Sequence, residues 1–426
     1  MLKGEITVLG DKSLSHRALI LGSLAQGETI IKGFLASQDC LATLTLLQKC
    51  GVRIEQSKEE VRVQGQGLTS LQAASEPLMC HNSGTSMRLL AGVFAAQPFS
   101  TVLQGDVSLN RRPMSRLVLP LRKMGAQIDG VHLENEIFPP LAIQGNPALQ
   151  GIHYAMPLAS AQVKSCLLLA GLFASTSTVL VENTPTRDHT ERMLKDFGAN
   201  IKVEYRKIIL TPSSILQAQE IVIPGDLSSA AFFITAAAMT PNSHLFVKNV
   251  GINPTRTGFI SILRQMGANI IIHPKVNLGS EPCADIEVKG ARLQGISIGQ
   301  EWISLTIDEF PILFIAAACA TGQTILRGAQ ELRFKETDRI QAMALGLSTL
   351  GISVAALRDG IIIQGGTLQG GAVDCFGDHR VAMAFAMAGL VAKNKVIISN
   401  AANIVTSFPN FKEVANQLGV PLYLED

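Results

Sequence analysis

The stretch LQKCGVRI at residues 47–54 recurs along the chain, and the fold can be predicted from it. The other copies are LRKMGAQI (121–128), LKDFGANI (194–201), LRQMGANI (263–270), LSTLGISV (347–354) and NQLGVPL (416–422). Glycine tolerates the left-handed conformation that commonly follows a helix. Each copy therefore predicts an amphipathic helix that ends at a glycine and is followed by a short strand. These glycines are Gly51, Gly125, Gly198, Gly267, Gly351 and Gly419.

A second series of segments alternates with the first. These segments are rich in alanine and apolar on all sides, which predicts helices that are buried in a core. They begin near Ser13, Gly84, Ser160, Ser228, Asp308 and Asp378. The two series together divide the chain into repeats of about 70 residues.

The repeats can be arranged in two ways. In a solenoid each repeat contacts only its neighbours, but solenoid repeats are usually shorter, and buried helices need sheets around them. We therefore expect an α/β (α+β) protein of two domains with three repeats each. The first domain would comprise residues 12–225, and the second would be discontinuous, comprising residues 1–11 and 226–426. The chain would cross between them near residues 10–17 and 223–229.

The composition limits the class of function. A chain of 426 residues exceeds one ordinary core, and its net charge of +2 gives no sign of nucleic-acid binding. The apolar runs are too short for a membrane span, and the first ten residues lack the apolar region of a signal peptide. The seven cysteines show no C-x-x-C spacing, which is typical of reduced cytoplasmic thiols. We expect a cytoplasmic protein that binds no nucleic acid, no membrane and no metal.

The segments that precede the buried helices are polar and carry several cations. Helix N-termini present N–H groups and a partial positive charge, so several such ends with Lys and Arg favour anions. The side chains concerned are Lys12, Ser13, Arg17, Asn82, Thr85, Arg88, Ser160, Gln162, Lys164, Asp308 and Arg380. We therefore expect a site for a phosphorylated or carboxylated small molecule.

The individual motifs also have simpler interpretations. Ser and Asp are common caps of ordinary helices, and NRRPMSR (110–116) could be an exposed basic turn. FKETDRI (334–340) could be a salt-bridged surface helix, because Lys335 and Arg339 are four residues apart. GEITVLGDKS (4–13) resembles a nucleotide-binding P-loop, but its glycine and lysine spacing is wrong.

Eight motifs occur in an order that resembles the 5-enolpyruvylshikimate-3-phosphate synthase family, over essentially the whole chain. They are GDKSLSHR, NSGTSMR, RRPM, SAQVKS, RDHTER, KETDR, DHRVAM and TSFPNF. SAQVKS and RDHTER are similar to the bacterial branch called class II. The resemblance implies a two-domain inside-out α/β barrel of six β-α-β-α-β-β repeats. It also implies transfer of the enolpyruvyl group of phosphoenolpyruvate (PEP) to the 5-hydroxyl of shikimate 3-phosphate, with no metal or organic cofactor.

The resemblance implies roles for individual residues. Asp308 would be the base at the 5-hydroxyl, Glu336 the acid to the methylene carbon of PEP, and Lys12 a cation shared by both substrates. The residues implied to bind shikimate 3-phosphate are Lys12, Ser13, Arg17, Ser160, Ala161, Gln162, Arg187, Asp308 and Lys335. Those implied to bind PEP are Lys12, Gly84, Arg112, Gln162, Arg339 and Arg380.

Further expectations follow from departures and alternatives. Some family members have a lysine where this chain has Thr406 and Ser407, so that role is not transferred. Gly84 implies sensitivity to glyphosate, a PEP analogue that a methyl group would crowd.

One alternative, UDP-N-acetylglucosamine enolpyruvyl transferase, typically has a cysteine before the RP pair, and this chain has none there. The other is a non-catalytic repeat scaffold. We expect a monomer.

Overall fold

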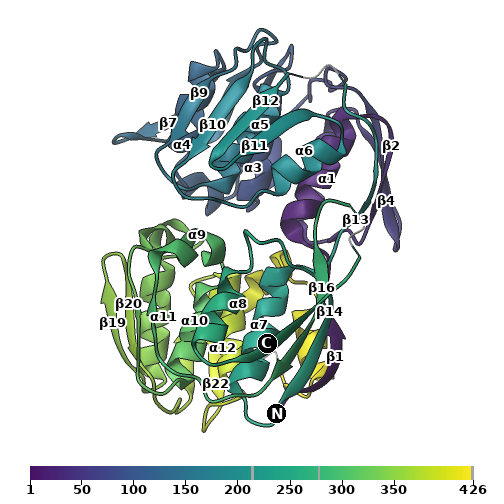
Figure 1. Cartoon of the computed structure of the whole chain (residues 1–426). Helices are drawn as coiled ribbons and strands as arrows, with labels where there is room; N and C mark the ends of the chain where they lie inside the picture. Colours follow the sequence, from purple (N-terminus) through teal and green to yellow (C-terminus); the bar gives the residue numbers. More distant parts are fainter. Residues whose placement is uncertain (213–214, 277–278, 424–426) are drawn as a thin grey trace. The chain divides into compact units, whose positions relative to one another are not determined.

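The computed structural model describes residues 1–212, 215–276 and 279–423. The chain divides into two compact units (Figure 1). Unit 1 comprises Met1–Leu9, Pro224–Asn277 and Pro282–Asp426, and unit 2 comprises Gly10–Ile223 and Leu278–Glu281. No helix within the described ranges is both long enough and apolar enough to cross a membrane.

Unit 2 contains three similar repeats, each with a buried helix, a second helix and strands. Its helices are α1 (Lys12–Leu24), α2 (Gln38–Lys49), α3 (Gly84–Phe94), the 3-10 turn η1 (Leu109–Arg111), α4 (Ser115–Lys123), α5 (Ala161–Gly171) and α6 (His189–Asp196). Its strands are β2 (Gln26–Lys32), β3 (Arg53–Gln56), β4 (Glu60–Gln66), β5 (Leu78–His81), β6 (Ser100–Gly105), β7 (Gln127–Leu133), β8 (Glu136–Gln144), β9 (His153–Met156), β10 (Thr178–Glu182), β11 (Asn200–Glu204), β12 (Lys207–Thr211) and β13 (Glu220–Val222).

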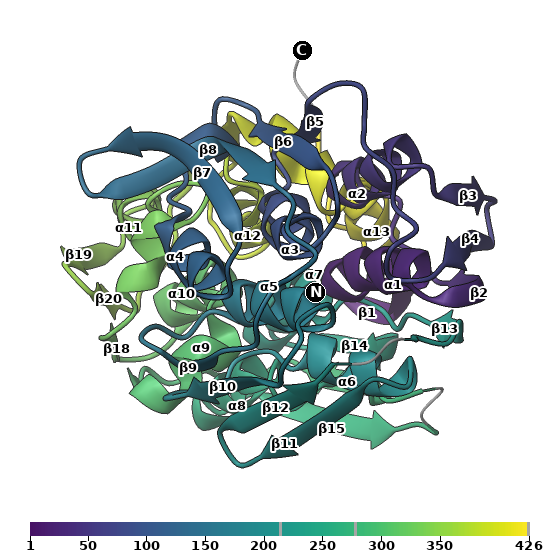
Figure 2. The ribbon, with the colours of Figure 1, turned by 90° about the horizontal axis from the view of Figure 1, so that it is seen from above.

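The three sheets of unit 2 share one strand pattern. Their orders are β13-β2-β4-β3, β5-β6-β8-β7 and β9-β10-β12-β11. In each sheet the first two strands are parallel and the other pairs antiparallel. Two of the parallel pairs are joined through a buried helix, as a parallel crossover requires. The helices α1, α3 and α5 form the centre, with the sheets around them (Figure 2).

Unit 1 repeats this plan with one reduced sheet. Its helices are α7 (Leu227–Met239), α8 (Gly258–Gln265), η2 (Gln300–Trp302), α9 (Ile303–Thr306), α10 (Phe310–Cys319), η3 (Gln330–Phe334), α11 (Arg339–Thr349), α12 (His379–Ala388), η4 (Ala401–Thr406) and α13 (Phe411–Gln417). Its strands are β1 (Lys3–Thr7), β14 (His244–Gly251), β15 (Asn269–Pro274), β16 (Cys283–Lys289), β17 (Ser297–Ile298), β18 (Gln323–Leu326), β19 (Ser353–Leu357), β20 (Gly360–Gln364), β21 (Gly371–Asp374) and β22 (Val396–Ser399). The sheet orders are β1-β14-β16-β15, β17-β18-β20-β19 and β21-β22.

The arrangement of the buried helices excludes a solenoid. In unit 1, α7, α10 and α12 contact one another in all three pairings, so the first repeat contacts the third. A solenoid repeat contacts only its neighbours. These helices are apolar on all sides because each lies among other helices and sheets of its own unit.

The six helix-ending glycines are confirmed, but one of the strands predicted after them is wrong. All six glycines have positive φ, from 74° at Gly419 to 94° at Gly125 and Gly267. Five are followed by β3, β7, β11, β15 and β19. After Gly419 the described residues, up to 423, form no strand. In the other repeats this strand pairs with a following antiparallel strand, and the described residues here include no such partner.

The strands that precede α1 and α7 are exchanged between the units. β1 precedes α1 in sequence but pairs with β14 of unit 1, whereas β13 precedes α7 but pairs with β2 of unit 2. Within unit 2 the backbones around this exchange are very close, since a Cβ on Gly10 would lie 1.8 Å from the carbonyl oxygen of Gly33. Only glycine allows such an approach.

Candidate active site

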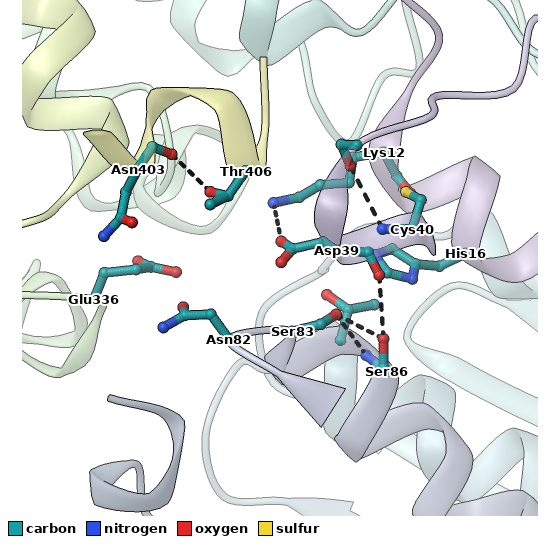
Figure 3. A network of polar contacts seen from close by, with 12 residues as sticks. Lys12, His16, Asp39, Cys40, Asn82, Ser83, Ser86, Glu336, Asn403 and Thr406 are labelled. Carbon is teal, nitrogen blue, oxygen red and sulfur yellow. Dashed lines mark hydrogen bonds and ion pairs between the residues drawn. The ribbon is translucent and has the colours of Figure 1, made fainter. Parts of the chain in front are cut away.

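The predicted site residues fall into two groups, one in each unit, and the first begins at the head of α1. The Asp11 side chain caps this helix by accepting a hydrogen bond from the Leu14 N–H at 2.9 Å. Lys12, the first residue of the helix, donates from Nζ to Oδ2 of Asp39 at 2.9 Å (Figure 3). Asp39 lies in the first turn of α2. The cap therefore fixes where the Lys12 ammonium leaves the helix, and Asp39 holds it there.

Arg17 is buried in the same unit, and its side chain donates hydrogen bonds to neutral groups. Its Nε donates to Thr190 Oγ1 and its Nη2 to Ser165 Oγ, both at 2.7 Å, and its Nη1 donates to the Ser13 carbonyl at 2.9 Å. Burial, together with the nearby cation Arg187, lowers the pKa of Arg17 to about 10, although the carboxylates of Glu191 and Asp11 oppose this shift. Two neighbouring cations repel each other, so a bound anion would stabilise both.

The heads of α3 and α5 are joined by hydrogen bonds. Arg88 Nη1 donates to Gln162 Oε1 at 2.8 Å, and Gln162 Nε2 donates to Thr85 Oγ1 at 3.1 Å. Ser160 caps α5 by accepting from the Val163 N–H at 3.4 Å. The two helix N-termini therefore lie together, with a cation and amide groups beside them.

Gly84, the first residue of α3, lies beside two guanidinium groups. A Cβ at this position would be 2.7 Å from Arg88 Nη1 and 3.3 Å from Arg112 Nη1. Arg112 is 9% exposed and donates from Nη2 to Asn82 Oδ1 at 2.7 Å. The exposed basic turn predicted as an alternative for residues 110–116 is therefore wrong for Arg112, because its side chain is held inside the unit.

The second group surrounds Arg339 in unit 1. This side chain is 1% exposed, and its guanidinium contacts three carboxylates. Nε donates to Asp378 Oδ2 at 2.8 Å and Nη2 to Glu336 Oε2 at 2.7 Å, while Nη1 lies 3.4 Å from Asp308 Oδ1. Burial opposes the charge of Arg339, but the carboxylates, Asp378 foremost, outweigh burial and raise its pKa.

Two further predicted residues contact Asp308, which lies just before α10. Lys335 Nζ is 3.6 Å from Asp308 Oδ1, and Arg380 Nη1 donates to the Asp308 carbonyl oxygen at 3.2 Å. All five predicted residues of unit 1 are therefore in one cluster of cations and carboxylates. Asp308 and Glu336 are partly exposed beside these cations, so either carboxyl group could exchange a proton with a bound substrate.

The surface-helix alternative for residues 334–340 is wrong. Asp338 caps α11, its side chain accepting from the Gln341 N–H at 3.0 Å, so the helix starts only at Arg339. Lys335 and Glu336 precede this cap and lie outside the helix. The motif therefore gives a turn whose side chains converge on Asp308 and Arg339.

Sequence reasoning missed the partners of the predicted cations. Asp39 pairs with Lys12 across 27 residues and Asp378 pairs with Arg339 across 39 residues. Asp378 was predicted as the start of a buried helix, and it does cap α12, but a cap gives no sign of the pairing with Arg339. No local pattern indicates the role of Asp39.

At the position where some family members have lysine, the Thr406 hydroxyl donates to the Asn403 carbonyl at 2.7 Å (Figure 3).

The fold and these two groups of residues are typical of an α/β enzyme that binds small anions. The family model described as EPSP synthase (3-phosphoshikimate 1-carboxyvinyltransferase) matches residues 1–415. The 3-phosphoshikimate 1-carboxyvinyltransferase of Coxiella burnetii is 54% identical over 421 residues, which are 98% of this chain and 95% of that protein. The enzyme of that name from Methylococcus capsulatus is 53% identical over 422 residues, 99% of this chain and 96% of its own length.

The solved structures agree with the sequence comparisons. EPSP synthase from Acinetobacter baumannii matches with a TM-score of 0.89 at 48% identity, covering 100% of this chain and 97% of the solved one. The chain belongs to the EPSP synthase (3-phosphoshikimate 1-carboxyvinyltransferase) family. The predicted resemblance and the predicted inside-out α/β fold class are thereby confirmed.

Proposed function

We propose that the chain is a 3-phosphoshikimate 1-carboxyvinyltransferase of the shikimate pathway, which leads to chorismate and the aromatic amino acids. It transfers the enolpyruvyl group of PEP to the 5-hydroxyl of shikimate 3-phosphate. The products are 5-enolpyruvylshikimate 3-phosphate and inorganic phosphate. The observation that carries the proposal is the buried Arg339, whose guanidinium contacts both the proposed base Asp308 and the proposed acid Glu336.

The charges of the two substrates fit the side chains of both groups. PEP and shikimate 3-phosphate each have a carboxylate and a phosphate, so their binding requires several cations. We assign Lys12, Ser13, Arg17, Ser160, Ala161, Gln162, Arg187, Asp308 and Lys335 to shikimate 3-phosphate. We assign Lys12, Gly84, Arg112, Gln162, Arg339 and Arg380 to PEP. Lys12, Arg17, Arg112, Arg187, Lys335, Arg339 and Arg380 supply the positive charge.

The acid and base account for the proton transfers. Asp308 accepts the proton of the 5-hydroxyl group while the hydroxyl oxygen attacks the central carbon of PEP. Glu336 protonates the methylene carbon of PEP. Lys12 and the arginines stabilise the tetrahedral intermediate and the phosphate that leaves it. The Glu336 carboxylate then takes a proton back from the new methyl group as the bond between carbon and the phosphate oxygen breaks. This restores the carbon–carbon double bond of the enol ether, and the proton held by Asp308 leaves with the phosphate.

A phosphate-release assay tests the activity directly. The purified protein should release inorganic phosphate from PEP only when shikimate 3-phosphate is present, because PEP is not hydrolysed alone. The same rate is expected with EDTA, since the proposed reaction uses no metal. UDP-N-acetylglucosamine in place of shikimate 3-phosphate is the matched control. Release with UDP-N-acetylglucosamine, or binding of both substrates without any release, would support the other transferase or a non-catalytic scaffold.

The remaining proposals concern organisation and location. We propose that the protein is a cytoplasmic monomer with two domains, residues 12–225 and residues 1–11 with 226–426. It uses no metal or organic cofactor and binds no nucleic acid or membrane. Light scattering after size-exclusion chromatography, which measures molar mass, tests the monomer, and a mass of twice 45.5 kDa would contradict it.

A further inference from the structure

Three charged side chains are buried together in unit 2 without a role in the proposed chemistry. Lys164 of α5 is 1% exposed, Glu182 at the end of β10 is 8% exposed, and Glu191 of α6 is 5% exposed. Lys164 Nζ lies 2.6 Å from Glu191 Oε1 and 3.1 Å from Glu182 Oε2. Burying charges is costly and rarely stabilises a fold better than apolar packing does. The cluster therefore calls for a reason beyond stability.

One side of this cluster fixes the segment that carries Arg187. Glu182 Oε1 accepts hydrogen bonds from both the N–H and the hydroxyl of Thr186. Lys164 Nζ donates to the carbonyl oxygen of the same residue at 3.3 Å. Every hydrogen-bonding group of Thr186 is thus bound by the cluster, and Arg187 is the next residue along the chain.

The other side fixes Arg17. Thr190 and Ser165 accept the hydrogen bonds of the Arg17 guanidinium, and their hydroxyl oxygens are 2.6 Å apart. Thr190 is the neighbour of Glu191 on α6, and Ser165 is the neighbour of Lys164 on α5. The ion pair between Lys164 and Glu191 therefore joins the two helices next to the hydroxyls that hold Arg17.

Together with Arg17, the cluster contains two charges of each sign. Lys164 and Arg17 supply two positive charges, and Glu182 and Glu191 supply two negative ones. Burial opposes the charge of Lys164, but Glu191 and then Glu182 outweigh it and raise the pKa of Lys164. Among the charged neighbours of Arg17, Glu191 acts most strongly in favour of its charged form. Burial raises the pKa of Glu191, and Lys164 is the group that opposes this rise. Loss of the Lys164 charge would therefore leave two buried carboxyl groups beside Arg17 without their partner cation.

We propose that Lys164, Glu182 and Glu191 are positioning residues, which hold Arg17 and Arg187 in place for the phosphorylated acceptor substrate. This inference rests on the proposed function, which assigns those arginines to shikimate 3-phosphate. The three residues act through the arginines and not by contact with the substrate. Their loss therefore weakens the use of one substrate and spares the other.

The first test removes one hydroxyl group and leaves the shape of the side chain nearly unchanged. Thr190→Val should raise the KM for shikimate 3-phosphate about tenfold, because it removes a hydrogen bond to a charged group. The KM for PEP and kcat should stay within about twofold, and Thr190→Ser should restore the wild-type KM. Thr178→Val is the matched control, since Thr178 is buried in the same unit and its hydroxyl has no hydrogen-bond partner among the residues that the structure describes. Its kinetic constants should not change.

The second test uses charge balance. Lys164→Met should raise the KM for shikimate 3-phosphate, and the double variant Lys164→Met with Glu191→Gln should bring it most of the way back. An unchanged KM for shikimate 3-phosphate in Thr190→Val would overturn the inference, and so would equal rises in both KM values. The wild-type protein is assayed first. Absence of its phosphate release contradicts the proposed function, whereas a negative variant result with an active wild type contradicts only the positioning role.

Discussion

At the residue scale, the missing side chain of Gly84 leaves room for two guanidiniums. Gly84→Ala would place a Cβ 2.7 Å from Arg88 and 3.3 Å from Arg112, so Arg88 must move and Arg112 is crowded. We expect the KM for PEP to rise roughly three- to tenfold. The added methyl group would displace Arg112, the proposed PEP ligand, and so weaken a hydrogen bond between charged groups. Glyphosate inhibition should weaken by a larger factor.

The measurement for Gly84→Ala is the initial rate at several concentrations of PEP and glyphosate. The KM for shikimate 3-phosphate in the same variant is the internal comparison. It should rise less than the KM for PEP, because only the contact between Arg88 and Gln162 links the change to that substrate. A variant that keeps the wild-type KM for PEP and the wild-type inhibition would show that Gly84 does not border the PEP position. Wild type that is insensitive to glyphosate would contradict the predicted sensitivity.

Asp308 is the residue on which the proposed chemistry depends most. Asp308→Ala should lower kcat by about 10²- to 10⁴-fold, because it removes the general base. Arg339 keeps its contacts with Asp378 and Glu336, so the fold should remain. Both substrates should still bind, shikimate 3-phosphate more weakly by the loss of one contact. Calorimetry with shikimate 3-phosphate measures the binding, and phosphate release measures turnover. An active Asp308→Asn variant, which keeps the shape without the base, would assign the proton transfer to another group.

At the scale of the elements, α3 and α5 cross in close contact at Gly92. A Cβ on Gly92 would lie 2.2 Å from the carbonyl oxygen of Cys166, so Gly92→Ala must push two helix backbones apart. We expect the free energy of unfolding to fall by about 1–3 kcal/mol, the usual cost of overpacking. Urea denaturation measures this change. Gly366→Ala is the control, because its Cβ would meet only Ile352 at 3.5 Å, and a similar loss there would contradict the explanation.

The sequence predicts helices and their ends better than it predicts strand partners. Helix ends depend on local residues, so the caps and the glycines from Gly51 to Gly419 could be recognised in the chain itself. Strand pairing depends on distant segments. The partner strands of β1 and β13, and the absence of a strand after Gly419 among the described residues, were therefore not predicted. The same holds in the site. Its cations were identified from motifs, whereas Asp39 could be found only in three dimensions.

At the scale of the whole molecule, acid should destabilise the sheet β1-β14-β16-β15 through Glu287. Contacts with His244, and then with His273 and Lys289, lower the pKa of Glu287 to about 2. A carboxylate with a lowered pKa stabilises the fold above its unfolded pKa of about 4.3, and this contribution is lost as pH falls towards 2. Glu287→Gln should therefore be less stable than wild type above about pH 5, and the difference should vanish near pH 2.

The urea midpoints of both proteins between pH 7 and pH 2 measure this dependence. Glu301→Gln is a suitable control, because Glu301 is exposed and has no ion pair among the described residues. A difference between wild type and Glu287→Gln that stays constant over the whole range would mean that the charge of Glu287 does not contribute to stability.

The exchange of β1 and β13 also sets an order of events during synthesis of the chain. Once residue 223 has left the ribosome, unit 2 has all three of its sheets, so most of this unit can fold while the rest is still being translated, and only the short segment that ends at Glu281 joins it later. β1 must wait for β14, which begins at His244, and until then it is an unpaired edge. Its sequence KGEIT, with Lys3 and Glu5 both exposed, suits that interval, because charged residues discourage an open strand from joining a strand of another nascent chain.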